Sequence, residues 1–102
     1  FARLVRVDPR NATARSALGR ILLARARPGE ALRHLELAYE MDPYSPLTRA
    51  LLARAYQMQG DSSRAGDHWR GVLAMTPEGD SLHAEAQAAL VAIPTANHRR
   101  PR

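Results

Sequence analysis

The segment Leu18-Gly19-Arg20-Ile21-Leu22-Leu23-Ala24 is followed by Pro28-Gly29-Glu30-Ala31-Leu32 and then by Leu35, Ala38, Met41 and Asp42-Pro43. Its apolar residues recur three and four positions apart, which predicts two short helices. The break between them is expected at Pro28. The second helix must end before Pro43, because the residue that precedes a proline avoids helical geometry. The small residues Gly19 and Ala31 are expected where the two helices touch.

The same pattern recurs 34 residues further along the chain. Three pairs of residues share that spacing: Asp8-Pro9, Asp42-Pro43 and Thr76-Pro77. The same shift carries Leu18 to Leu52, Gly19 to Ala53, Ala31 to Ala65 and Leu35 to Trp69. A repeat of this length is one supersecondary unit, which buries its apolar face only by stacking on its neighbours. The repeat therefore predicts an all-α fold built from stacked helix pairs.

The repeat resembles the tetratricopeptide repeat family, whose pattern combines W-x2-L-G-x2-Y with a later A-x3-F and a Pro. The unit 46–79 matches it with Leu52, Ala53, Tyr56, Gly60-Asp61, Ala65, Trp69 and Pro77. The unit 12–45 matches it with Leu18-Gly19, Ala31, Ala38 and Pro43. Departures occur at Arg15 and Arg49, where the family often has Trp, and at Ala26-Arg27, where it usually has Gly-Asp. The resemblance implies antiparallel helix-turn-helix repeats stacked as a right-handed α-solenoid.

Helices are expected over about 12–25, 28–41, 46–59, 62–75 and 80–93, with Asn11, Ser45 and either Asp61 or Ser62 as N-caps. Each glycine inside the fourth helix costs about 1 kcal/mol relative to alanine. We therefore expect Gly66 or Gly71 to mark a close helix contact. The last helix no longer follows the repeat spacing and is expected to cap the stack. Its inward residues are predicted to be Leu82, Ala86, Leu90 and Ile93.

The two ends of the chain are expected to differ from the repeats. Residues 1–8 align with the end of a second helix, so we interpret them as the end of a preceding repeat in a longer solenoid. Phe1, Leu4 and Val5, with Leu18 nearby, would then form an apolar end that self-associates in isolation. Residues 94–102 lack apolar periodicity and are rich in arginine, which predicts a basic flexible tail after a repeat domain of residues 1–93.

Composition excludes several classes of protein. A chain of 102 residues that is 45% hydrophobic suits one small domain. It has no apolar run long enough to span a membrane, and without cysteine it has neither a disulfide framework nor a thiolate metal site. The net charge of +5 is carried by arginine, with no lysine. Because arginine and alanine codons are GC-rich, genome composition explains this charge at least as readily as a basic binding surface.

Spacing does not gather residues for catalysis or metal binding. His34 and His68 are one repeat apart, so they should lie about 10 Å apart on stacked helices. Zinc needs several ligands at about 2 Å from one centre. The serines are explained by capping or exposure, and nothing brings a base to any of them. We therefore expect no enzyme, no metal and no cofactor.

The resemblance implies that the first helices of successive units line a concave groove that binds a peptide or a partner segment. The repeat register assigns to it Thr13, Ser16, Arg20, Leu23, Ala24, Leu47, Ala50, Leu51, Arg54, Gln57 and Met58. Arg20 and Arg54 are one repeat apart and would form a short arginine ladder, which suits carboxylates. The predicted ligand is an acidic or C-terminal-carboxylate segment with an apolar residue beside Leu47 and Met58. Alternatively, both arginines neutralise acidic groups of the protein itself.

A second interpretation of the basic surface is polyanion binding, such as RNA, through Arg20, Arg54, Arg64, Arg70 and the tail. Single-stranded nucleic acid also requires aromatic side chains for base stacking. Most of the five aromatic residues fall at core positions of the repeat. The function that the sequence favours is therefore a non-catalytic scaffold for protein–protein interaction, with no membrane contact.

Overall fold

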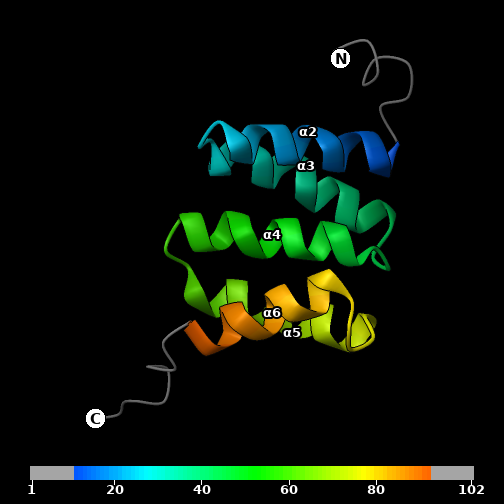
Figure 1. The fold of residues 1–102 in the computed structure, drawn as a ribbon. Helices are drawn as coiled ribbons and strands as arrows, with labels where there is room; N and C mark the ends of the chain where they lie inside the picture. The colour runs from blue at the N-terminus through cyan, green and yellow to red at the C-terminus, as the bar shows by residue number, and fades with distance from the viewer. Residues whose placement is uncertain (1–10, 93–102) are drawn as a thin grey trace.

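The structure is a computed structural model that describes residues 11–92, and these residues form five α-helices (Figure 1). The first hairpin is α2 (Ala12–Ala24) with α3 (Pro28–Met41), and the second is α4 (Pro46–Met58) with α5 (Ser62–Met75). The last helix is α6 (Ser81–Ala92). Each lies within one residue of the range expected from the sequence. The expectations for Phe1, Leu4, Val5, Ile93 and the tail concern residues outside the described range.

Four helices begin where a side chain pairs with an amide of the first turn, and at α6 Asp80 accepts a hydrogen bond from the amide of Leu82 at 2.8 Å. Asn11 accepts a hydrogen bond from the amide of Ala14 at 3.0 Å, and Ser45 accepts one from Thr48 at 3.2 Å. Asp61 accepts one from the amide of Arg64 at 3.1 Å, so Asp61 rather than Ser62 is the cap. These bonds satisfy N–H groups that have no partner inside the helix.

The turns inside the two hairpins share a left-handed residue. Gly60 has φ of 82° after α4, and Ala26, one repeat earlier, has φ of 59° after α2. Glycine adopts this conformation without steric cost, whereas alanine does not. The departure from the family pattern at residue 26 therefore keeps the backbone turn and places a strained residue in it.

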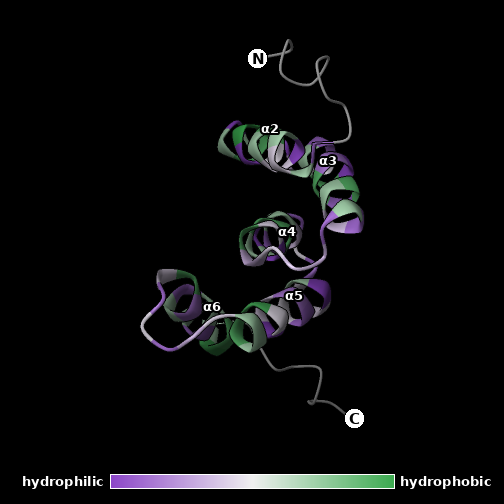
Figure 2. Cartoon of the chain, turned by 90° about the vertical axis from the view of Figure 1, so that its right-hand side faces the viewer, coloured by the Kyte–Doolittle hydropathy of each residue, from purple (hydrophilic) through white to green (hydrophobic). Residues whose placement is uncertain are grey.

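The helices form two layers that continue from one hairpin to the next. Figure 2 shows α2, α4 and α6 in one layer, with α3 and α5 beside them in the other. α4 packs on both helices of the first hairpin, and α6 packs on α4 and α5 in the same way. α6 thus packs where the first helix of a third unit would lie, although its sequence was expected to leave the repeat spacing. Its inward residues Leu82, Ala86 and Leu90 pack on the core as expected.

Small residues allow the close helix contacts. A Cβ at Gly19 of α2 would lie 2.5 Å from Leu35 Cγ of α3. A Cβ at Gly71 of α5 would collide with the Arg49 guanidinium of α4, which confirms a glycine contact in this helix. The atoms nearest to a Cβ at Gly66 would belong to the side chain of Arg70 in its own helix, at 3.4 Å or more.

The core consists of two apolar clusters that share α4. The cluster on the first hairpin contains Ala31, Leu35, Leu51, Leu52 and Ala55. The other contains Ala50, Ala53, Ala65, Trp69, Val72 and Ala86. Because α4 contributes residues to both clusters, it is the central helix and fixes the position of the first hairpin relative to α5 and α6.

One position of the repeat changes along the stack. Gly19 of α2 and Ala53 of α4 are buried, whereas Gln87 of α6, at the same repeat position, is exposed. Within residues 11–92 no second helix covers this face of α6. A side chain as long as glutamine also prevents the close approach that Gly19 permits to α3.

Candidate functional site

Two adjoining hollows lie between α2 and α4. The first is lined by Ala12, Thr13, Ser16, Ala17, Arg20, Asp42, Ser45, Leu47, Thr48 and Leu51. The second is lined by Arg20, Leu23, Ala24, Leu51, Arg54 and Met58. Both contain Arg20 and Leu51, so they form one continuous depression, called here the α2–α4 groove. Nine of the site residues expected from the sequence line it: Thr13, Ser16, Arg20, Leu23, Ala24, Leu47, Leu51, Arg54 and Met58.

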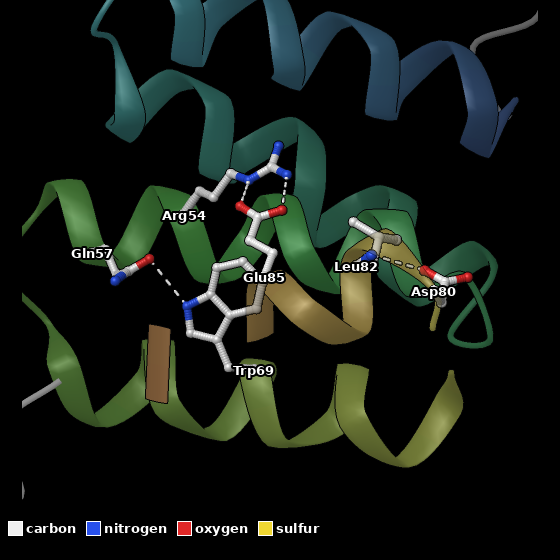
Figure 3. A network of polar contacts seen from close by, with 6 residues as sticks. All are labelled: Arg54, Gln57, Trp69, Asp80, Leu82 and Glu85. Atoms are coloured by element: carbon white, nitrogen blue, oxygen red, sulfur yellow. Dashed lines mark hydrogen bonds and ion pairs between the residues drawn. The ribbon is translucent and has the colours of Figure 1, made fainter. Parts of the chain in front are cut away.

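Two expected groove residues lie elsewhere. Ala50 is 0% exposed and belongs to the core cluster with Trp69 and Ala86, so it offers no surface to a ligand. α6 is part of the cluster that covers this side of α4. Gln57 lines neither hollow, and its Oε1 accepts a hydrogen bond from Trp69 Nε1 at 3.0 Å (Figure 3).

The floor of the groove contains a chain of hydroxyl groups. Ser16 Oγ lies 2.7 Å from Thr48 Oγ1, and the two residues are only 6% and 2% exposed. Thr48 Oγ1 donates to Ser45 Oγ at 3.2 Å, so Ser16 supplies the proton for its bond to Thr48. Sequence reasoning missed Thr48. The available signal was a polar residue at a repeat position that holds Ala14 and Leu82 in the other units.

The two arginines of the groove have different surroundings. Arg20 is exposed, and its guanidinium forms no hydrogen bond or ion pair with any other residue in the range 11–92. Arg54 donates two hydrogen bonds to Glu85 of α6, from Nε to Oε2 at 2.8 Å and from Nη2 to Oε1 at 2.5 Å (Figure 3). The expectation that these arginines neutralise the protein's own carboxylates therefore holds for Arg54, while Arg20 keeps its guanidinium available.

The groove combines apolar walls with an uneven distribution of charge. Leu47 and Met58 are 42% and 47% exposed at its margins. Asp42 lines the first hollow near the turn before α4, where it accepts a hydrogen bond from the amide of Tyr44 at 3.1 Å. A ligand carboxylate is thus attracted to Arg20 and repelled by Asp42.

Three of the arginines considered for polyanion binding already face an acidic neighbour. Arg54 pairs with Glu85 at 2.5 Å, Arg64 with Asp61 at 2.8 Å and Arg70 with Asp67 at 2.5 Å. These carboxylates reduce the positive potential that a phosphate backbone would meet.

Arg49 occupies the position where related repeats often have Trp. Its guanidinium lies 5.1 Å from the centroid of the Tyr39 ring, and its Nη1 donates to Tyr39 Oη at 3.1 Å. His68 lies beside it, stacked on Tyr56 at 5.7 Å and edge-on to Tyr39 at 5.8 Å. Burial, followed by the nearby Arg49 charge, lowers the pKa of His68. The histidine is therefore part of the packing between helices.

Among residues 11–92, no three His, Cys, Asp or Glu side chains gather closely enough to hold a metal ion. No helix in this range has the length and apolar character needed to cross a bilayer.

The family model of the tetratricopeptide repeat matches residues 22–93, well over half of the sequence. The chain belongs to the tetratricopeptide repeat family, and its fold is an all-α helical-repeat solenoid. Repeats of this family generally mediate protein–protein interactions and are typically non-catalytic scaffolds. A search among curated proteins returns no significant match.

Proposed function

We propose that this protein binds a segment of a partner protein in the α2–α4 groove, with a carboxylate of the segment on Arg20. The observation that carries the proposal is the position of Arg20, which is exposed, common to both hollows and unpaired within residues 11–92. A guanidinium can donate two parallel hydrogen bonds to one carboxylate. An apolar side chain of the segment would lie on Leu47, which is 42% exposed.

The two parts of this contact have different roles. An exposed ion pair contributes only about 0–1 kcal/mol. Apolar contact contributes about 25 cal/mol for each Å² removed from water. The apolar walls therefore supply most of the affinity, and Arg20 selects among segments that fit them. Asp42 sets the direction in which a bound segment lies, because its negative charge disfavours an acidic residue of the segment at the end of the groove near the turn before α4.

A library of random displayed peptides tests this function, with Arg20→Glu compared against wild type. We expect wild type to select peptides that combine an acidic residue with an apolar one. Arg20→Glu should weaken those peptides by at least about tenfold, because like charges then face each other. The matched control is Arg33→Glu, which makes the same charge change at an exposed position of α3 outside the groove.

The proposal is wrong if Arg20→Glu binds the wild-type peptides as tightly as Arg33→Glu does. Titration with single-stranded RNA examines the polyanion interpretation in the same preparation. RNA binding that falls steeply with salt and is lost in both variants would favour a diffuse basic surface over a peptide groove.

A further inference from the structure

The second arginine of the groove is occupied by a carboxylate from within the chain. Both carboxylate oxygens of Glu85 in α6 accept hydrogen bonds from the Arg54 guanidinium, Oε2 from Nε at 2.8 Å and Oε1 from Nη2 at 2.5 Å. Figure 3 shows the carboxylate pointing from α6 directly at the guanidinium. The two side chains are 35% and 39% exposed, so the pair lies at the surface.

The repeat itself provides the comparison with Arg20. A shift of 34 residues carries Arg54 to Arg20 and Glu85 to Leu51. Beside Arg20 the repeat position on the next first helix is therefore held by Leu51, whereas beside Arg54 it is held by the carboxylate of Glu85. Arg20 therefore has the setting of Arg54 without the acidic residue that satisfies it.

We propose that Glu85 is a specificity-determining residue of the α2–α4 groove. The Glu85 carboxylate occupies the Arg54 guanidinium, which a ligand carboxylate would otherwise bind. This role rests on the function proposed above. The groove then binds a single ligand carboxylate, at Arg20. The preferred ligand is a segment with one acidic residue beside apolar residues. Segments with a second acidic residue toward Met58 are disfavoured.

Two physical effects produce this preference. A ligand carboxylate at Arg54 must displace a group tethered to the same protein, which acts at an effective concentration in the millimolar range or above. If Glu85 stays in place, its negative charge repels the incoming one. Rejection of polyacidic segments thus arises from a repulsive group rather than from a missing contact, which is a common route to specificity.

The experiment uses two matched peptide probes from the library described above. One has a single glutamate, and the other carries a second glutamate on the side that faces Met58. Fluorescence polarisation gives the ratio of their affinities for wild type, for Glu85→Gln and for Glu85→Gln with Arg54→Gln. We expect wild type to bind the second probe equally or more weakly. Glu85→Gln should favour it by about two- to fivefold, which is the worth of one exposed ion pair, and the double variant should lose this gain.

A ligand-independent measurement accompanies these affinities. Phenylglyoxal modifies accessible guanidinium groups, and mass spectrometry of the digested protein reports the rate at each arginine. Arg54 should react more slowly than Arg20 in wild type and at a similar rate in Glu85→Gln. Circular dichroism checks that α6 remains folded in the variant, since Ala86 next to the substituted residue is part of the core.

The outcomes separate the two proposals. If Arg20→Glu discriminates as expected but Glu85→Gln leaves the probe ratio unchanged, the role of Glu85 is wrong and the groove function stands. Equal reactivity of Arg54 and Arg20 in wild type also overturns the role of Glu85. If Arg20→Glu has no effect on either probe, the groove function itself fails, and the inference fails with it.

Discussion

Gly19 of α2 faces Leu35 of α3 so closely that a Cβ at Gly19 would lie 2.5 Å from the leucine Cγ. Leu35 is fully buried and belongs to the cluster that joins the first hairpin to α4. It therefore cannot move aside without disturbing the packing of both hairpins. The first unit depends on the absence of a side chain at this one position.

Gly19→Leu should lower the free energy of unfolding by at least about 1–3 kcal/mol through overpacking. Urea denaturation followed by circular dichroism measures the change. Gly29→Ala is the matched control, because its Cβ would lie 3.6 Å from Gln59 Nε2, an ordinary contact. The control should stay within about 1 kcal/mol of wild type. Equal midpoints for Gly19→Leu and wild type would show that α2 and α3 do not meet there.

Thr48→Val should destabilise the protein by about 1–3 kcal/mol, because the buried Ser16 hydroxyl loses its partner. The double variant Ser16→Ala with Thr48→Val removes both hydroxyls and should cost less than the two single changes added together. A complete double-mutant cycle with urea denaturation gives this coupling energy. Strict additivity would contradict a direct bond between the two side chains.

Ala26→Gly should stabilise the protein by about 0.5–1 kcal/mol. Relief of the left-handed strain gains about 1–2 kcal/mol, and the greater freedom of glycine in the unfolded chain returns about 0.4–1 kcal/mol of that. Gly60→Ala is the mirror experiment at the equivalent turn, whose φ is 82°, and it should destabilise. Thermal unfolding of the two variants should shift in opposite directions. A shift in the same direction would rule out left-handed strain as the cause.

Stability should fall as the pH is lowered below about 6.5, because the pKa of His68 in the folded protein lies below its ordinary value of 6.5. Burial and Arg49 lower it, against smaller opposing effects of Glu36 and Asp67. His68 Nδ1 is also buried without a hydrogen-bond partner among residues 11–92. Between the folded pKa and 6.5 the unfolded chain holds more protons than the folded one. The free energy of unfolding therefore rises with pH through that window and levels off above it.

His68→Phe should flatten this pH dependence while keeping the ring stacked on Tyr56. Urea denaturation at several pH values compares its slope with that of wild type. Some slope should remain, because burial, Arg15 and Arg33 lower the pKa of His34 in the same direction. An unchanged slope in His68→Phe would mean that His68 does not titrate in the folded core.

Local chemistry made much of this molecule predictable. The spaced prolines and capping side chains located all five helices of residues 11–92, and small residues such as Gly19 located the contact within the first hairpin. The repeat register found most of the groove. Each of these features depends on a residue's own properties or on its position in the repeat.

The neighbours of a side chain were harder to infer. Ala50 was assigned to the groove because the register alone does not show that its side of α4 joins the core with α6. The Arg54–Glu85 pair was missed for the same reason, since α6 was set apart from the repeat and Glu85 aligns with Leu51. The bond from Ser16 to Thr48 joins two units, and its offset of 32 residues differs from the repeat length.

The exposed Gln87 of α6 has a consequence for lengthening this array by engineering. Gly19 and Ala53 are buried at this repeat position in the first helices of the preceding units, whereas α6 has the exposed side chain of Gln87 there. Gln87→Ala would turn the last helix into an acceptor for a grafted unit. Packing of a further helix against α6 at this repeat position therefore depends on the volume of one side chain.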